Sequence, residues 1–294
     1  MSGPEKKICI ILNPAAKGER ARNLSEKLRR HLPGCRLVLT RRPGHAQELA
    51  RGLALEGVDT VVAAGGDGTV NEVVNGIVDF GVQLGILPVG TVNVFAMEMG
   101  IPADLRQASE IVLEGHVREL DVACANQRHF IQLAGVGFDA ETVQATDLNF
   151  KKMVGPLSYV LAAMHVAAQK PPQLHVVCDN RREIEGCFVL VGNGRFYGGP
   201  FEFFPEADMQ DGKMDVCVFK KRTHFDLLRY FQGIMSGSHT RFDDVEYLKA
   251  RRIVVTADRK VPFEVDGELQ GGTPVIFTVK KKLLPVLVPG LHRR

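Results

Sequence analysis

From residue 8 to residue 99, the sequence alternates between short, continuously apolar runs and segments whose apolar side chains recur every three or four residues. The runs predict strands and the periodic segments predict helices. Strands joined by single helices pair in parallel with right-handed crossovers, and strands that are apolar throughout suit a sheet covered on both faces. The predicted strands are Ile8–Leu12, Leu37–Leu39, Thr60–Ala64 and Leu84–Leu87, and the predicted helices cover 21–31, 46–53, Val70–Val78 and Val92–Met99.

The pattern changes after Val117, where short β-rich segments separated by turn signals follow one another. These segments are Arg118–Ala123, Arg128–Leu133, Leu174–Cys178, Phe188–Val191, Met214–Phe219, Arg252–Thr256, Val261–Val265 and Val275–Val279, and two helical stretches, Leu157–Ala168 and Phe225–Met235, interrupt them. We interpret this half as a mostly antiparallel β-sandwich. The sequence therefore predicts an α/β domain over residues 1–118 and a β-sandwich domain over residues 119–282, with residues 283–294 available to pack back on the first domain.

Composition excludes several classes of protein. The 294 residues are 45% hydrophobic and 24% charged, which is typical of a globular protein with two domains. A net charge of +3 is too small to predict nucleic-acid binding. The N-terminus lacks a signal-like apolar segment, and no apolar run approaches the roughly 20 residues of a membrane span. We therefore expect a cytoplasmic protein whose membrane contact is peripheral. The sequence leaves open whether it forms a homodimer.

The strongest local signal is the glycine-rich segment that follows the strand Thr60–Ala64. It contains Gly65, Gly66, Asp67, Gly68, Thr69, Asn71 and Glu72. Glycines allow backbone N–H groups to approach an anion, and a helix start attracts one. The spacing of Thr69 and Glu72 predicts a capping box. Asp67 beside a polyphosphate requires a divalent cation between them, so it indicates a metal–nucleotide; the alternative is a tight glycine turn with an acid at a helix start.

A second loop repeats this arrangement after the next strand, where Gly90 and Thr91 lead into a helix. The first two strands end at Asn13 and Thr40. Four strand ends thus place small or hydroxylated residues on one edge of a parallel sheet, where ligands bind. Neither glycine loop has the spacing of a Walker A motif or of a dinucleotide fingerprint.

Together these motifs resemble the diacylglycerol kinase catalytic family, whose bacterial members are stand-alone lipid kinases related in fold to NAD kinases and phosphofructokinases. The matching residues are Asn13-Pro14, Gly65–Glu72, Pro88 with Gly90, Thr91, Asn93, Phe95 and Ala96, then Gly137–Ala140, Asn193-Gly194, Gly198-Gly199 and Asp266-Gly267-Glu268. The resemblance implies ATP binding by Asn13, Pro14, Thr40, the segment Gly65–Glu72 and Thr91. The sequence departs from the family at Lys17-Gly18 and at Val94. At the position of Val94, many members have an aspartate near the nucleotide and its magnesium.

Asp266 and Glu268 are the candidate catalytic acids. Taken alone, Asp266-Gly267 between two apolar runs predicts a type I′ hairpin turn. The resemblance instead implies an acidic motif in which one carboxylate takes the proton of the acceptor hydroxyl and the other orients it or helps to hold the metal. The residues leave open which acid is the base.

The segment around Asp211 is the candidate metal site. It resembles the part of some bacterial relatives that holds a structural Mg²⁺ through the Asp211 carboxylate and the backbone carbonyls of Asp208 and Lys213; the alternative is an Asp-Gly turn. Lys151 and Lys152 match a basic position near the active site of relatives; the alternative is a solvated helix start. The clusters Lys280–Lys282 and His292–Arg294 are either solvated surface or candidates for docking on anionic lipid.

The resemblance implies an ATP- and Mg²⁺-dependent kinase of lipid metabolism, acting on a diacylglycerol-like or sphingoid-like hydroxyl at the membrane surface. Two alternatives stay open from the residues. One is a kinase of the same superfamily that acts on NAD or a sugar phosphate, and the other is a catalytically inactive lipid-binding relative.

Overall fold

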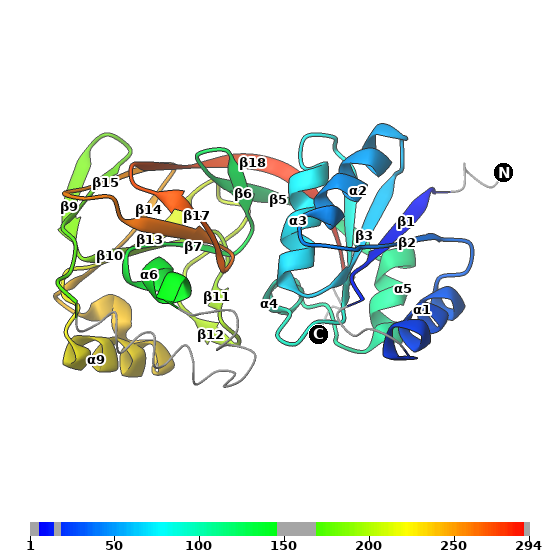
Figure 1. Ribbon diagram of the computed structural model, residues 1–294, viewed down its shortest axis with the longest axis horizontal. Helices are drawn as coiled ribbons and strands as arrows, with labels where there is room; N and C mark the ends of the chain where they lie inside the picture. Colours follow the sequence, from blue (N-terminus) through cyan, green and yellow to red (C-terminus); the bar gives the residue numbers. More distant parts are fainter. Residues whose placement is uncertain (1–5, 15–18, 146–168, 291–294) are drawn as a thin grey trace. The chain divides into compact units, whose positions relative to one another are not determined.

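The computed structural model describes residues 6–14, 19–145 and 169–290 (Figure 1). The chain divides into two compact units. Unit one comprises Met1–Val122, Gly198–Pro200 and Lys281–Arg294, and unit two comprises Ala123–Tyr197 and Phe201–Lys280. The predicted helix Leu157–Ala168 lies outside the described residues. Among the described residues, no helix has the length and apolar character needed to span a membrane.

Unit one is built on the predicted parallel sheet, in the order β2-β1-β3-β4. Its strands are β1 (Ile8–Leu12), β2 (Arg36–Leu39), β3 (Thr60–Gly65) and β4 (Gln83–Pro88). Leu12 pairs with both Leu39 and Ala64, and Gly65 pairs with Pro88, so the carboxyl ends of the four strands are level. On the other side of β4, Leu84 pairs in parallel with Val286 of β18 (Val275–Val288).

The described residues of unit one form five helices: α1 (Glu19–His31), α2 (His45–Leu55), α3 (Asp67–Ile77), α4 (Val94–Glu98) and α5 (Leu105–Glu114). Four of them match predicted helices, although α4 is shorter because Asn93 adopts a left-handed conformation (φ 58°) before it. Helix α5 was not predicted. Its signal was present, because Asp104 caps the helix by accepting a hydrogen bond from Gln107 N and Gly115 follows its last residue.

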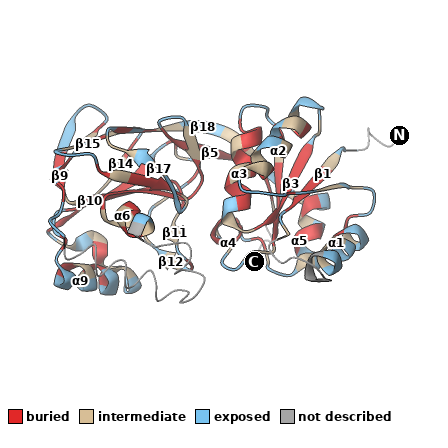
Figure 2. Cartoon of the chain, viewed as in Figure 1, coloured by how far each residue is buried: buried red, intermediate tan, exposed pale blue. Residues whose placement is uncertain are grey.

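Unit two contains two antiparallel sheets, as predicted. One has the order β14-β13-β10-β7-β16-β17 and the other contains β15 with β18 on one side and β8-β9 on the other. Side chains of both sheets share one core, with Val189 and Val216 from the first and Val176, Ile253 and Phe277 from the second. Figure 2 shows these strands as largely buried. The two sheets therefore form a sandwich.

The strands of the first sheet are β7 (Leu133–Val136), β10 (Phe188–Gly192), β13 (Met214–Phe219), β14 (Val245–Ala250), β16 (Pro262–Val265) and β17 (Glu268–Gly272). The others are β5 (His116–Ala125), β6 (Arg128–Phe130), β8 (Leu174–Cys178), β9 (Arg182–Gly186), β11 (Phe196–Tyr197), β12 (Phe201–Glu202) and β15 (Arg252–Ala257). The helices of unit two that the structure describes are α6 (Phe138–Ala145), α9 (His224–Met235) and the short η1 (His239–Arg241).

Two strand predictions need correction. The predicted strand Arg128–Leu133 is divided into β6 and the start of β7, because the amides of Ile131, Gln132 and Leu133 bind the side chain of Asp266 and leave the ladder. The predicted strand Val275–Val279 is longer than expected, because it is the first part of β18, which continues to Val288.

Candidate active site

The two glycine loops of unit one are in direct backbone contact. A Cβ atom built on Gly90 would lie 2.4 Å from the Cα atom of Gly66, and one built on Gly65 would lie 2.5 Å from the Thr69 side chain. A larger residue at Gly90 would therefore force the loops after β3 and β4 apart, and one at Gly65 would collide with Thr69 in the first turn of α3. The close approach explains why glycine occurs at these positions and presents two strand ends as one surface.

The predicted capping box at Thr69 and Glu72 is wrong. Helix α3 begins at Asp67 with Gly66 as its N-cap, and no side chain caps it. The Thr69 hydroxyl instead accepts a hydrogen bond from Asn13 Nδ2 at 2.9 Å. The two oxygens of Glu72 accept hydrogen bonds from the N atoms of Gly44 (2.8 Å) and Ala46 (2.9 Å), so this acid stabilises the start of α2.

Asp67 connects the two loops through its carboxylate. Its Oδ1 accepts a hydrogen bond from Phe95 N in α4 at 3.0 Å, whereas Oδ2 has no hydrogen-bond partner among the described residues. Asn93 fixes the second loop by accepting from Gly90 N (3.1 Å) and donating to Gly90 O (3.0 Å). The Asp67 carboxylate is thus held in place with one oxygen available to a cation, which fits a metal–nucleotide ligand.

The structure brings some predicted nucleotide residues together and turns others inward. Asn13 N and Thr40 N donate to the carbonyls of Ala64 (3.0 Å) and Leu12 (2.9 Å), so both residues lie at the sheet edge beside the glycine loop. Pro14 follows Asn13 at this edge, and Thr91 is exposed. Asn71, by contrast, is buried within α3.

Gly68 lies in the first turn of α3 with open space around it. Val94 is buried, so the position that carries an aspartate in many relatives is part of the core here. Lys17-Gly18, Lys151, Lys152 and His292–Arg294 lie outside the described residues.

The Asp266-Gly267 pair of unit two forms the hairpin turn that its sequence predicts. Both residues have positive φ (47° and 84°), as a type I′ turn requires, and they join β16 to β17. The Asp266 carboxylate accepts hydrogen bonds from the amides of Ile131 (3.0 Å), Gln132 (3.0 Å) and Leu133 (3.1 Å). Asp266 is therefore both a turn residue and the anchor of a neighbouring segment.

Glu268 has different surroundings from Asp266. Its side chain is 50% exposed and lies 3.6 Å from the guanidinium of Arg128. Its carboxylate can reach a ligand, whereas three of the hydrogen-bonding positions on Asp266 are taken by backbone amides.

A buried pair of acids next to this turn was not found by sequence reasoning. Glu264 Oε2 accepts a hydrogen bond from Gly267 N at 2.6 Å, and Tyr197 Oη donates to both oxygens of Asp139 at 3.1 and 3.0 Å. Burial raises the pKa of Glu264 well above its ordinary value, and the neighbouring Asp139 raises it further. Asp139 lies in the matched segment Gly137–Ala140 and Glu264 is an acid within the otherwise apolar run Val261–Val265, but neither signal indicated that the two acids pair.

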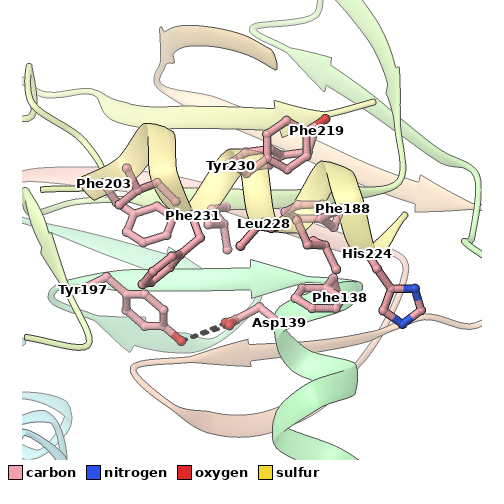
Figure 3. A pocket seen from close by; sticks show the side chains of 13 residues that line it. Phe138, Asp139, Phe188, Tyr197, Phe203, Phe219, His224, Leu228, Tyr230 and Phe231 are labelled. Carbon is pink, nitrogen blue, oxygen red and sulfur yellow. Dashed lines mark hydrogen bonds between the residues drawn. The ribbon is translucent and has the colours of Figure 1, made fainter. Parts of the chain in front are cut away.

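Asp139 also lines an apolar cavity of about 460 Å³ in unit two (Figure 3). The wall is formed by aromatic and aliphatic side chains of α6, α9 and the strands between them, and Asp139 and His224 are its two titratable groups other than tyrosine. The lining residues are Phe138, Asp139, Phe188, Leu190, Tyr197, Phe203, Phe219, His224, Leu227, Leu228, Tyr230, Phe231 and Ile234. Such a lining suits a hydrocarbon ligand.

A second cavity, of about 570 Å³, lies in unit one and was also missed from the sequence. Lys27, Arg30, His31 and Arg106 line it together with the loop 88–90. Its cationic side chains come from α1 and α5 and can attract an anionic group. Asn13, Thr40 and Asp67 do not line this cavity.

In the predicted metal segment, the ammonium group of Lys249 lies beside the carboxylate of Asp211. Lys249 Nζ donates to Asp211 Oδ2 (2.9 Å) and to Glu206 O (2.6 Å), and it lies 3.8 Å from Asp215. The Asp208 carbonyl accepts from Asp211 N (3.2 Å), and Asp211 Oδ1 accepts from Lys213 N (2.8 Å). The described residues contain no cluster of three or more His, Cys, Asp or Glu side chains suited to a metal. A magnesium ion at Asp211 would have to displace Lys249, so these residues do not fit the ion.

Both units of the chain are similar to known proteins. Residues 7–125 match the family model of the diacylglycerol kinase catalytic domain, and residues 133–288 match that of the YegS C-terminal NAD kinase beta sandwich-like domain. The chain is 33% identical to a diacylglycerol kinase of Bacillus subtilis (strain 168) over 251 residues, covering 84% of this chain and 83% of the relative. It is 30% identical to that of Staphylococcus aureus (strain MRSA252) over 299 residues, covering 97% and 93%. A crystal structure of a diacylglycerol kinase from Bacillus anthracis str. Sterne superposes with a TM-score of 0.79 at 26% identity, covering 98% of each chain.

Proposed function

This chain belongs to the diacylglycerol kinase family, and on that premise we propose that it transfers the γ-phosphoryl group of ATP to the hydroxyl of a diacylglycerol-like or sphingoid-like lipid. The family membership supports a kinase. The nature of the acceptor is inferred from the residues that line the cavity of unit two.

The apolar cavity is the observation that carries the proposal. Its wall is almost entirely aromatic and aliphatic, and its volume of about 460 Å³ accommodates a folded alkyl chain. NAD or a sugar phosphate would need many polar partners, because burying its hydroxyls and phosphates without hydrogen bonds is costly. A lipid acceptor is therefore favoured over a small polar one.

The nucleotide is assigned to the glycine loops of unit one. Asp67 would hold the Mg²⁺ of the nucleotide through Oδ2, while Asn13, Thr40 and the first turn of α3 would contact the phosphates. When bound, the ion neutralises the charge that develops on the transferring phosphoryl group. The Phe95 N–H fixes the orientation of the Asp67 carboxylate toward that position.

We assign the removal of the proton from the acceptor hydroxyl to the acidic pair Asp266 and Glu268. Asp266 is rigidly oriented by three backbone amides, and Glu268 has the more accessible carboxylate. Removing the hydroxyl proton makes the lipid oxygen a better nucleophile for the γ-phosphorus. The two acids thus combine a fixed orientation with an accessible oxygen.

One experiment tests the assignment of activity and acceptor together. The purified protein is incubated with labelled ATP and Mg²⁺, and with diacylglycerol, monoacylglycerol, phosphatidylglycerol, ceramide or sphingosine in mixed micelles, with NAD and fructose 6-phosphate as polar acceptors. We expect label in one or more lipids. Transfer to NAD or to the sugar phosphate alone would reject the proposal. ATP turnover in none of the mixtures would support the inactive lipid-binding alternative.

A further inference from the structure

Helix α9 carries a row of large apolar side chains on its solvent side. Phe225 is 74% exposed, Leu228 56%, Phe231 57% and Met235 55%. They are separated by three, three and four residues, so they lie on one side of the helix. Figure 2 shows exposed residues along this helix. We name these four residues the α9 stripe. Single exposed apolar residues are ordinary, but four on one face of a 12-residue helix indicate an interaction surface.

The stripe is not needed to hold α9 in place. Thr223 and Asp226 form a capping box that fixes the start of the helix. Arg229 and Tyr230 both bind the carboxylate of Asp244, and Tyr230 is buried. These contacts lie on the side of the helix that faces the sandwich. The outer side chains can therefore meet a partner without loss of the packing beneath them.

The stripe is continuous with the apolar cavity. Leu228 and Phe231 belong to both, because they line the cavity while remaining more than half exposed. Figure 3 shows them between α9 and the aromatic wall. Phe225 and Met235 belong to the stripe only. A hydrocarbon chain entering along α9 would thus pass from one apolar surface to another without crossing water.

The charges around the stripe suit lipid headgroups. The acid of α9, Asp226, is buried, so the exposed positions of the helix carry no carboxylate. Lys221, just before the helix, has 63% of its side chain exposed, with its Nζ 3.9 Å from Asp244 Oδ2. Apolar side chains flanked by a cation are the pattern of helices that lie in the membrane interface.

We propose that the α9 stripe docks on the surface of a phospholipid bilayer, with Phe225, Leu228, Phe231 and Met235 inserted among the acyl chains, so that the cavity opens into the lipid. The role in substrate delivery rests on the proposed lipid kinase function. The docking itself does not, because it follows from the exposed stripe, its continuity with the cavity and the lack of an exposed carboxylate on α9.

The test uses Phe225→Ser and Met235→Ser, singly and together, because neither residue lines the cavity. Leu55→Ser is the matched control, since Leu55 is 70% exposed on α2 of unit one. Binding to vesicles of equal parts phosphatidylcholine and phosphatidylglycerol is measured by co-sedimentation without ATP. Lipid phosphorylation is then compared on the same vesicles and on a short-chain lipid acceptor dissolved as monomers. Melting temperatures establish that each variant is folded.

We expect the double variant to lose at least about tenfold in vesicle affinity, since it no longer buries a Phe and a Met side chain in lipid. The control should bind like the wild type. Turnover should fall on vesicles and be unchanged on the monomeric lipid. Wild-type protein that does not bind vesicles, or a double variant that binds them equally well, would overturn the proposal.

Self-association is measured by sedimentation velocity in parallel. A double variant that turns a wild-type dimer into a monomer while vesicle binding is unchanged would assign the stripe to a second copy and overturn the proposal. If the stripe variants lose vesicle binding but no lipid is ever phosphorylated, the docking surface stands and the proposed kinase function fails.

Discussion

Asp139 and Glu264 present carboxyl oxygens to the same point in the interior of unit two. A Cβ atom built on Gly135 would lie 2.7 Å from Asp139 Oδ2 and 3.0 Å from Glu264 Oε1. Glu264 Oε1 receives no hydrogen bond from a donor in the described part of the chain, and burial raises the pKa of both acids. Two ionised carboxylates would repel each other here, whereas one shared proton joins them by a hydrogen bond. Glu264 also holds the Asp266-Gly267 turn, because its Oε2 accepts the hydrogen bond from Gly267 N.

Glu264→Gln should change how stability depends on pH. The raised pKa means that the folded wild type binds a proton that the unfolded chain releases, so the contribution of Glu264 to the free energy of unfolding should be fully present below the ordinary pKa of 4.5 and be lost as the pH rises toward the raised value. Glutamine cannot ionise, and its amide can still donate to Asp139. Melting temperatures of the variant should fall less steeply above pH 4.5. Glu183→Gln, an exposed change on β9, is the control, and equal slopes for Glu264→Gln and wild type would contradict the shared proton.

Asp67→Asn should remove phosphoryl transfer while preserving the fold. The asparagine oxygen can still accept from Phe95 N, but the side chain no longer offers a charged oxygen to Mg²⁺. We expect kcat to fall at least about 10²-fold, as for other groups that stabilise developing charge. Initial rates and nucleotide binding with and without Mg²⁺ are the measurements. Asp79→Asn, just beyond the end of α3, serves as the control, and wild-type turnover in Asp67→Asn would exclude the metal–nucleotide assignment.

Substitutions of the two acids of the hairpin should differ in their effect on the free energy of unfolding. Asp266→Asn replaces a carboxylate that accepts three amide hydrogen bonds, so we expect a loss of about 1–3 kcal/mol in the free energy of unfolding along with a lower kcat. Glu268→Gln alters a half-exposed side chain and should cost less than about 0.5 kcal/mol.

If Glu268 receives the proton, kcat of Glu268→Gln should fall about 10²–10⁴-fold with nucleotide affinity retained. Denaturation curves, ATP binding and lipid phosphorylation are compared for both variants. Wild-type kcat in both would place the base at another residue.

Asp211→Ala should lower stability equally in magnesium and in chelator buffers. Its partner in the structure is Lys249, and an ion pair within the protein does not respond to added metal. A bound ion would add stability by mass action in magnesium buffer alone. Thermal melting in the two buffers measures the difference. A markedly larger loss in magnesium would identify a metal site and would show that Lys249 yields its position to the ion.

The parts of the structure set by local sequence were predictable. Apolar runs and helical periods located the parallel sheet of unit one, and the Asp266-Gly267 dipeptide located a hairpin turn. Contacts between distant residues were not. The Thr69–Glu72 spacing is shared by capping boxes and by residues inside a helix, and only the position of α2 reveals that Glu72 binds Gly44 and Ala46.

The acid pair and the cavity escaped prediction for a similar reason. Asp139 and Glu264 come from α6 and β16, which the sequence does not show to be neighbours. Phe225 and Phe231 were correctly placed in a helix, but its period does not say which apolar side chains the sandwich leaves uncovered.

The place of β18 also has a consequence for how the protein is made. In unit one, β4 is an open edge of the sheet until β18 is added and Val286 pairs with Leu84. On the ribosome, residues 6–122 emerge long before residues 281–290, so the nascent first unit waits with one strand edge open while the second unit is synthesised. A chaperone that shields strand edges should therefore act on this unit during translation, and a fragment truncated at Val122 should aggregate unless the segment 281–290 is supplied as a peptide or by circular permutation.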